Sequence, residues 1–358
     1  MRNRVLDRDR AGVEAAPALI PPAEHMQTIA ALKPRRERPA IAILALNAGT
    51  EVCDLLSSYG VLAESGVADV AVVAERADPI RLYPGFRVDA QATTAQFDAC
   101  YPEGADYVVV PAMEPHDDPA IVAWIRAQHG KGATIVSVSD GALTLAAAGL
   151  LDERRGTGHW YSVKRLQAKH PTMQWVRDRR YVVDRGVATS TGITASIPLM
   201  ITLTEAIGGR AAAETLAMRL GVADWSARHD SAAFRLTAAH RKTFLRNKLS
   251  FWRHGTAHIK VDDHVDEIAL GLMVDAHSRT ELTKVITVGS ALVQSRRGLR
   301  LRPDAPTTSA SMLEPQRDAP AQTLDRELAR IASRHGAATA ALVALVMEYP
   351  WSETRRAG

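Results

Sequence analysis

The sequence has few cysteines and no long apolar stretch. Only Cys53 and Cys100 occur among the 358 residues, which argues against a disulfide-stapled secreted domain and fits a reducing compartment. No run of about 18 or more apolar residues occurs, so we expect no transmembrane helix. The opening MRNRVLDRDR lacks the apolar segment of a secretory signal. These absences predict a cytoplasmic protein without a membrane partner.

Features of DNA-binding and metal-binding proteins are also missing. The formal charge is +4, but it comes largely from arginines scattered along the chain, and no helix-turn-helix pair follows Trp225. The histidine-bearing pairs, His229 with Asp230 and His254 with His258, lack a third ligand at a suitable spacing. We therefore expect no nucleic-acid partner, no metal and no cofactor.

What is present is an alternation of strand and helix patterns from Ala40 onward, in a chain that is 46% hydrophobic. The patterns predict strands at 41–46, 70–74, 107–110, 135–138, 181–184 and 187–190, a hairpin at 80–88, and helices at 51–65, 119–128 and 195–206. This spacing predicts an α/β fold, in which a parallel sheet is covered by helices on both faces.

The chain is organised around the stretch 135–160, which reads IVSVSDGALTLAAAGLLDERRGTGHW. A short buried strand leads into Ser139, and strong helix formers follow it. The spacing matches a nucleophile elbow, G-x-S-x-G, with Ser137 in place of the first glycine and Gly141 as the second. The alternative is a plain strand–helix connection that contains a serine. In parallel sheets ligands bind at the carboxyl ends of strands, where Ser139 falls.

Two stretches, AAAGLLDERRGTGHW and STGITASIPLMITLTEAIGG, resemble the ThiJ/PfpI family of the class I glutamine-amidotransferase-like superfamily. The resemblance is greatest to the amidase-like domain at the front of AraC-type transcription regulators, and it covers about residues 40–225. It implies a flavodoxin-like α/β sandwich with a nucleophilic cysteine in the elbow, a histidine downstream and an acid from the first helix. It also implies a homodimer.

By position in this family, Ser139 takes the place of the cysteine, His159 that of the histidine, and Asp54 that of the acid. Glu51 is the alternative acid, since it lies nearly one turn before Asp54. A serine hydroxyl needs a neighbouring base to become a nucleophile, and His159 is the candidate. A dipeptidase E-like branch of the superfamily uses serine at this elbow, so the exchange is compatible with catalysis.

The oxyanion site departs from the family pattern. Many members have Gly-Gly after the proline that ends the third strand, whereas Pro111 is followed here by Ala112 and Met113. A Cβ at these positions restricts the backbone conformations that would aim an N–H at the site. The Asp140 amide, next to Gly141, is the remaining candidate donor, although the Asp140 carboxylate would oppose a developing oxyanion.

The chain divides into four predicted segments. Residues 1–38 form a mobile basic arm with a short helix near 26–32, and residues 39–226 form the ThiJ/PfpI-like domain. Residues 227–254 form a helical connector. Its basic helix carries apolar residues at helical spacing, which we expect to pack between the halves: Phe244, Leu245, Leu249 and Trp252. Residues 255–352 form a degenerate half-copy with a mobile, Pro/Ser-rich loop at 303–322.

The half-copy is inferred from an internal repeat. A shift of 213 positions takes Gly85 to Gly298 and Val72 to Val285, and places Asp54 on Glu267. It predicts a strand at 258–261, a helix at 264–278, a strand at 283–288, a hairpin around 298 and one closing helix at 324–347. The elbow strand is missing, so no second site is expected. Chance similarity between two α/β segments is the alternative.

Two functions follow from these observations. The first is a hydrolase or hydratase of a small amide-, nitrile- or aldehyde-like substrate that uses Ser139 as nucleophile. The second is a catalytically lapsed ligand-sensing or regulatory scaffold related to AraC-type regulators. Both give the protein a small-molecule ligand, and the sequence leaves open whether it is an enzyme.

Overall fold

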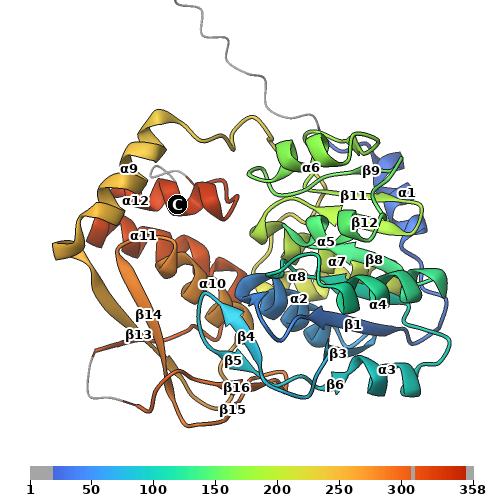
Figure 1. The fold of residues 1–358 in the computed structure, drawn as a ribbon, viewed down its shortest axis with the longest axis horizontal. Helices are drawn as coiled ribbons and strands as arrows, with labels where there is room; N and C mark the ends of the chain where they lie inside the picture. Colours follow the sequence, from blue (N-terminus) through green and yellow to red (C-terminus); the bar gives the residue numbers. More distant parts are fainter. Residues whose placement is uncertain (1–18, 308–310, 352–358) are drawn as a thin grey trace, which may run out of the picture.

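The computed structural model describes residues 19–307 and 311–351, and the chain forms two α/β units that lie side by side (Figure 1). The first unit, coloured blue to yellow-green, holds the larger sheet, and the second, coloured orange to red, holds a smaller one. Within these described residues, no helix combines the length and the apolar character that crossing a bilayer requires.

The first unit is built on a seven-stranded sheet in the order β11-β12-β8-β7-β1-β3-β6. Its strands are β1 (Ala40–Ala45), β3 (Asp69–Ala74), β6 (Ala92–Thr93), β7 (Tyr107–Val110), β8 (Thr134–Ser137), β11 (Tyr181–Asp184) and β12 (Val187–Ser190). All neighbours are parallel except β11 and β12. The sheet with its helices is the predicted flavodoxin-like sandwich, and the central strands are apolar because both faces are covered.

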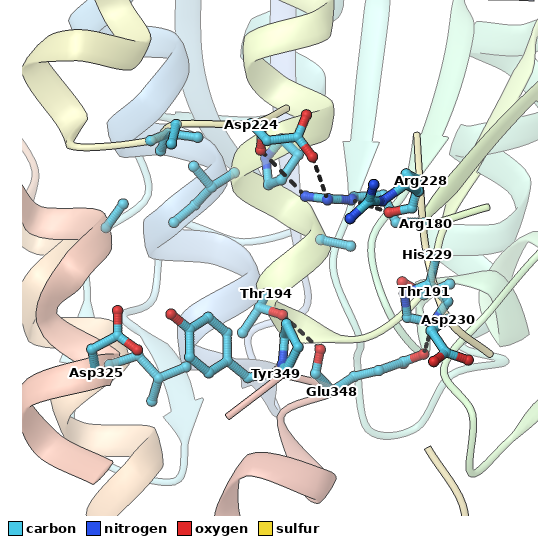
Figure 2. A pocket seen from close by; sticks show the side chains of 18 of the residues that line it. Arg180, Thr191, Thr194, Asp224, Arg228, His229, Asp230, Asp325, Glu348 and Tyr349 are labelled. Carbon is cyan, nitrogen blue, oxygen red and sulfur yellow. Dashed lines mark hydrogen bonds and ion pairs between the residues drawn. The ribbon is translucent and has the colours of Figure 1, made fainter. Parts of the chain in front are cut away.

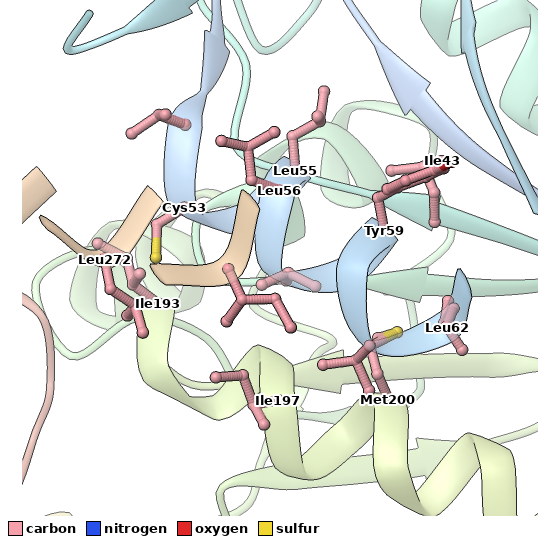
Figure 3. Close-up of a cluster of buried hydrophobic side chains, with 14 of the residues drawn as sticks. Ile43, Cys53, Leu55, Leu56, Tyr59, Leu62, Ile193, Ile197, Met200 and Leu272 are labelled. Atoms are coloured by element: carbon pink, nitrogen blue, oxygen red, sulfur yellow. The ribbon is translucent and has the colours of Figure 1, made fainter. Parts of the chain in front are cut away.

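Alternate side chains of β1 enter two separate cores. Ile41 and Ile43 pack with helices α2 (Val52–Ser65), α7 (Ser196–Gly208) and α8 (Arg210–Leu220), a cluster that Figure 3 shows in part. Ala42 and Leu44 pack with α3 (Thr94–Cys100), α4 (Pro119–Gly130) and α5 (Gly141–Ala147). Because successive strand residues point to opposite faces, the helices form two layers around the sheet.

Shorter elements connect these layers. They are β2 (Thr50–Glu51), β4 (Ile80–Tyr83), β5 (Arg87–Val88), β9 (Arg155–Gly156), β10 (Gln174–Trp175), α6 (Val163–Lys169) and η1 (Ile193–Ala195). The hairpin of β4 and β5 stands out from the main sheet and faces the second unit.

Much of the predicted mobile arm is fixed to the first unit. Helix α1 (Pro22–Ala31) is held by an ion pair between Glu24 and Arg179 and by a hydrogen bond between His25 and Glu205. After it, Arg36 pairs with the buried Asp106. Residues 22–38 of the predicted arm thus contact the first unit, and residues 1–18 lie outside the described residues.

The connector helix α9 (Ala238–Leu249) buries a polar face instead of the predicted apolar one. Leu245, Leu249 and Trp252 are exposed, Trp252 lying in the short helix η2 (Phe251–Arg253). The inward side chain is Asn247, whose Nδ2 donates to Thr280 O at 3.0 Å and to a threonine hydroxyl of the second unit at 3.1 Å. The predicted packing stripe is thus wrong, because hydrogen bonds of Asn247 orient the helix.

The second unit repeats the start of the first, as predicted. Its elements β13 (Gly255–Val261), α10 (Glu267–Ser278), β14 (Thr283–Gly289), β15 (Val293–Gln294) and β16 (Arg300–Arg302) follow the order of β1, α2, β3, β4 and β5. Strands β13 and β14 are parallel, as β1 and β3 are. This order and direction of elements is what a repeat of the unit predicts.

The segment 303–322, predicted as a loop, contains short elements of regular structure. Its described part contains β17 (Met312–Leu313), which pairs with β13 in parallel, and η3 (Pro320–Gln322). Strand β17 takes beside β13 the place that β7 takes beside β1. Residues 308–310 lie outside the described residues.

The predicted single closing helix is two helices, α11 (Thr323–His335) and α12 (Ala337–Val346). Gly336 separates them with φ 92°, a conformation that glycine adopts without the strain of a Cβ. Gly209, with φ 84°, breaks α7 from α8 in the same way. The break is therefore part of the repeat.

Candidate functional site

Ser139 lies at a sharp turn between β8 and α5. Its φ is 52°, in the left-handed region, which costs a non-glycine residue about 1–2 kcal/mol. Gly141 makes the turn possible, because a Cβ at this position would lie 2.0 Å from the Val110 carbonyl oxygen. Ser139 is 4% exposed. The turn thus has the close approach that an elbow requires, at the carboxyl edge of the sheet.

Replacing Gly141 with alanine is expected to destabilise the fold by about 1–3 kcal/mol or more, because backbone must move to admit the methyl group. Urea denaturation measures the loss. Gly130→Ala in α4 is the matched control, since a Cβ there meets no atom within 4 Å, and it is expected to be neutral or slightly stabilising. Equal effects of the two substitutions would contradict the tight turn.

The two candidate acids lie at the start of α2 and are buried. Glu51 caps the helix, its Oε2 accepting from the Asp54 N–H at 2.7 Å. Asp54 Oδ2 accepts from the Ala112 N–H at 3.0 Å. Glu51 N–H in turn donates to Ala112 O, and Met113 bridges to Thr50. Ala112 and Met113, predicted to line the oxyanion pocket, therefore anchor the acids, and the Ala112 N–H is already engaged.

Two residues that the sequence did not single out complete this acid cluster. Arg279 of α10 approaches Glu51, with Nη2 3.3 Å from Oε1, and its Nε lies 2.7 Å from Asp275 Oδ1. Asp275 is wholly buried near the end of α10. The spacing of Asp275 and Arg279, four residues apart, could have indicated an ion pair along one helix. Nothing in the sequence connected that pair to Glu51.

The acid cluster holds more carboxyl groups than positive charges. Burial raises the pKa of Glu51 and of Asp54 well above the usual range, and the neighbouring Asp275 adds to both effects. Burial also raises the pKa of Asp275, against the pull of Arg279. Like charges this close in a buried site disfavour one another, so the protonated form of these carboxyl groups is favoured more than in water. Its chemistry is that of a carboxylic acid that can donate a proton.

His159 is positioned by the second unit. Its Nε2 donates to Val346 O at 2.9 Å, which leaves Nδ1 as the acceptor nitrogen of the neutral ring. The next residue, Trp160, donates from its indole to Leu345 O at 2.8 Å. Among the described residues, no hydrogen bond joins Ser139 to His159.

Both residues nevertheless lie beside the end of β12. The Ser139 N–H is 3.4 Å from the Ser190 hydroxyl, which accepts it. A Cβ on Gly192, two residues later, would lie 2.9 Å from the His159 ring. Ser139 and His159 thus each contact the end of β12 or the turn that follows it.

A cavity of about 650 Å³ lies between the two units (Figure 2). Its lining includes Thr191, His229, Asp325 and Glu348. Glu348 pairs with His229 at 2.9 Å and accepts from the Trp160 N–H at 3.3 Å, so the cavity adjoins the segment that carries His159. The volume is in the range of pockets that hold small metabolites.

The fold defines a flavodoxin-like α/β protein with a left-handed serine in its β8–α5 turn and buried acids at the start of α2. Within the described ranges, no group of three or more histidine, cysteine or acidic side chains is arranged to hold a metal ion.

Comparison with known proteins identifies the family. The DJ-1/PfpI family model matches residues 40–206. Isonitrile hydratase from Pseudomonas putida is 31% identical over 172 residues, which make up 47% of this chain and 72% of that protein. The chain therefore belongs to the DJ-1/PfpI family.

Two further relatives are similar over less of their length or at lower identity. The HTH-type transcriptional regulator CdhR from Pseudomonas aeruginosa is 40% identical over 85 residues, 24% of this chain and 25% of the regulator. The chain thus spans about a quarter of that regulator's length. A solved ThiJ/PfpI family protein from Pseudomonas syringae is 24% identical, with a TM-score of 0.46 over 51% of this chain and 74% of that one.

Proposed function

We propose that the protein is a hydratase or hydrolase of a small carbon–nitrogen compound, with Ser139 as its nucleophile. The observation that carries this proposal is the left-handed Ser139 turn, together with a buried acid cluster whose carboxyl pKa values are raised. The left-handed φ of Ser139 costs conformational free energy. Such strained backbone conformations persist where the surrounding structure imposes them, and they cluster at active sites. Similarity to isonitrile hydratase suggests an isonitrile as the substrate.

In the proposed reaction Asp54 is the acid. Its Oδ1 is buried and, among the described residues, has no hydrogen-bond partner, so a proton there is free to transfer. The proton goes to the terminal isonitrile carbon, Ser139 Oγ bonds to the same carbon, and the hydroxyl proton passes to His159 Nδ1. The product of this step is an imidate ester of Ser139.

Water completes the reaction. Its oxygen bonds to the imidate carbon and the bond from that carbon to Ser139 Oγ breaks, which releases an N-substituted formamide. The two water protons and the proton held by His159 return to the nitrogen, to Oγ and to Asp54. The Asp140 N–H, which no group among the described residues accepts, is the proposed donor to developing negative charge.

The test is turnover of a panel of alkyl isonitriles, nitriles, primary amides and aldehydes across a range of pH. Because Asp54 must be protonated, activity is expected to fall about tenfold for each pH unit above the raised pKa of Asp54. The raised pKa keeps activity present well above pH 4, where an ordinary carboxyl group is ionised. Activity that rises with pH through this range would contradict Asp54 as the acid.

Ligand sensing is the second candidate, and the cavity between the units favours it. The cavity is lined by both units, so a bound metabolite would contact residues of each, such as Thr191 and Asp325. Similarity to the regulator CdhR is in keeping with such a role. A panel compound that raises the melting temperature but is not turned over would support sensing over catalysis.

A further inference from the structure

The hairpins of the two units pair across a local two-fold axis. Strand β5 runs antiparallel to β16, with Val88 opposite Leu301, and these two residues are equivalent under the shift of 213 positions. Within the hairpins, Ile80 pairs with Val88 just as Val293 pairs with Leu301. A residue that faces its own equivalent marks the axis of an isologous contact, the kind that relates two identical subunits.

The helices that follow the first strand of each unit also pack together. All residues of α2 from Val52 to Leu62 and of α10 from Glu267 to His277 are buried. Close approach depends on small residues: a Cβ on Gly60 would lie 2.5 Å from the Ile268 side chain, and one on Gly271 would lie 3.3 Å from Leu56 Cβ. The face of α2 that would be free in an isolated first unit is therefore covered.

Ion pairs cross the same interface at both ends of the helix pair. Arg279 of the second unit reaches Glu51 at the start of α2, at 3.3 Å. Arg297 of the second unit pairs with Glu64 at the other end of α2, at 2.8 Å. These contacts bind the units through buried charge as well as apolar area.

We propose that the second unit is a built-in partner subunit. It fills, across the local two-fold axis, the surface through which the first unit would pair with a second copy, and its Arg279 completes the acid cluster beside the Ser139 turn. One chain then carries one complete site as a monomer, in place of the homodimer expected from the sequence. This inference does not depend on whether Ser139 reacts.

The oligomeric state is tested by sedimentation velocity of the full chain from low to high micromolar concentration. The expected result is a single species with the chain mass of 38.8 kDa at every concentration. A stable dimer would overturn the proposal, since it would show that the internal copy does not replace a second chain.

The contribution of Arg279 to the acid cluster is tested by carboxyl-carbon NMR titration of the full chain. Because Arg279 opposes the raised pKa values of Glu51, Asp54 and Asp275, Arg279→Met should raise titration midpoints in the cluster by about 1–3 pH units. Arg279→Lys is the more conservative change because it keeps the positive charge. Its titration midpoints should lie between those of Arg279→Met and those of the unaltered chain.

Arg300 provides the matched control. It pairs with Asp89 at the surface and is 60% exposed, so Arg300→Met should leave these midpoints unchanged. If the titration midpoints of the cluster are the same in Arg279→Lys, in Arg279→Met and in the unaltered chain, Arg279 has no part in the site and the proposal fails.

Discussion

Replacing Ser139 with alanine is expected to reduce kcat by about 10³-fold or more on whichever panel compound the protein turns over. In the proposed reaction the hydroxyl forms the bond to the substrate carbon, so its loss would remove the covalent step rather than weaken binding. KM should change little, because the methylene group and the shape of the pocket remain. Steady-state kinetics separates the two parameters.

Ser137 is the matched control for this substitution. It lies two residues earlier on β8, and its hydroxyl is buried without a hydrogen-bond partner among the described residues. Ser137→Ala removes the same group from the same strand but leaves the turn intact, so turnover should be preserved. Equal turnover by the unaltered chain and the Ser139→Ala variant would end the assignment of Ser139 as nucleophile.

The largest expected loss of stability follows from Arg279→Met. The guanidinium is the positive partner of Glu51 and Asp275, both of which are buried. Removing one member of a buried ion pair leaves uncompensated charge, which costs about 3–5 kcal/mol. Urea denaturation followed by circular dichroism measures the change in the free energy of unfolding. Arg300→Met, which removes a surface ion pair with Asp89, should cost at most about 1 kcal/mol.

The stability that the acid cluster contributes is expected to fall as pH rises. Glu51 and Asp54 have pKa values raised in the folded state, so the folded chain holds protons that the unfolded chain has released. The contribution of these two carboxyl groups to the free energy of unfolding is therefore fully present below the unfolded carboxyl pKa of about 4. It declines as pH rises toward the folded pKa. Arg279→Met should extend this decline to higher pH. A variant whose stability difference is the same at pH 4 and pH 8 would contradict the role of Arg279.

The sequence predicted well those features that depend on local pattern. Buried apolar runs fixed β1, β7 and β8, and the spacing around Ser139 located the turn. The repeat predicted the second unit because the same order of strand, helix, strand and hairpin recurs. It missed the break at Gly336, where a single glycine in a helix-forming stretch adopts a left-handed φ.

The parts of the site that the sequence did not predict depend on contacts between distant segments. Arg279 meets Glu51 only because α10 packs on α2, and neither helix pattern indicates its partner. His159 is held by the carbonyl oxygen of Val346, and a backbone atom leaves no signature in side-chain identity. The orientation of α9 likewise depends on Asn247, which reads as a surface residue until its partners on the second unit are known.

The difference between the two units affects the shape of the ligand-binding curve that we expect. In an assembly of two identical chains, every substitution appears twice and two equivalent sites can influence each other. Here Gly66 stands where the shift of 213 positions would place an equivalent of Arg279, and the described part of the second unit has no counterpart of the Ser139 turn. Saturation of a single site per particle is hyperbolic, with a Hill coefficient of about 1, because cooperativity requires at least two sites.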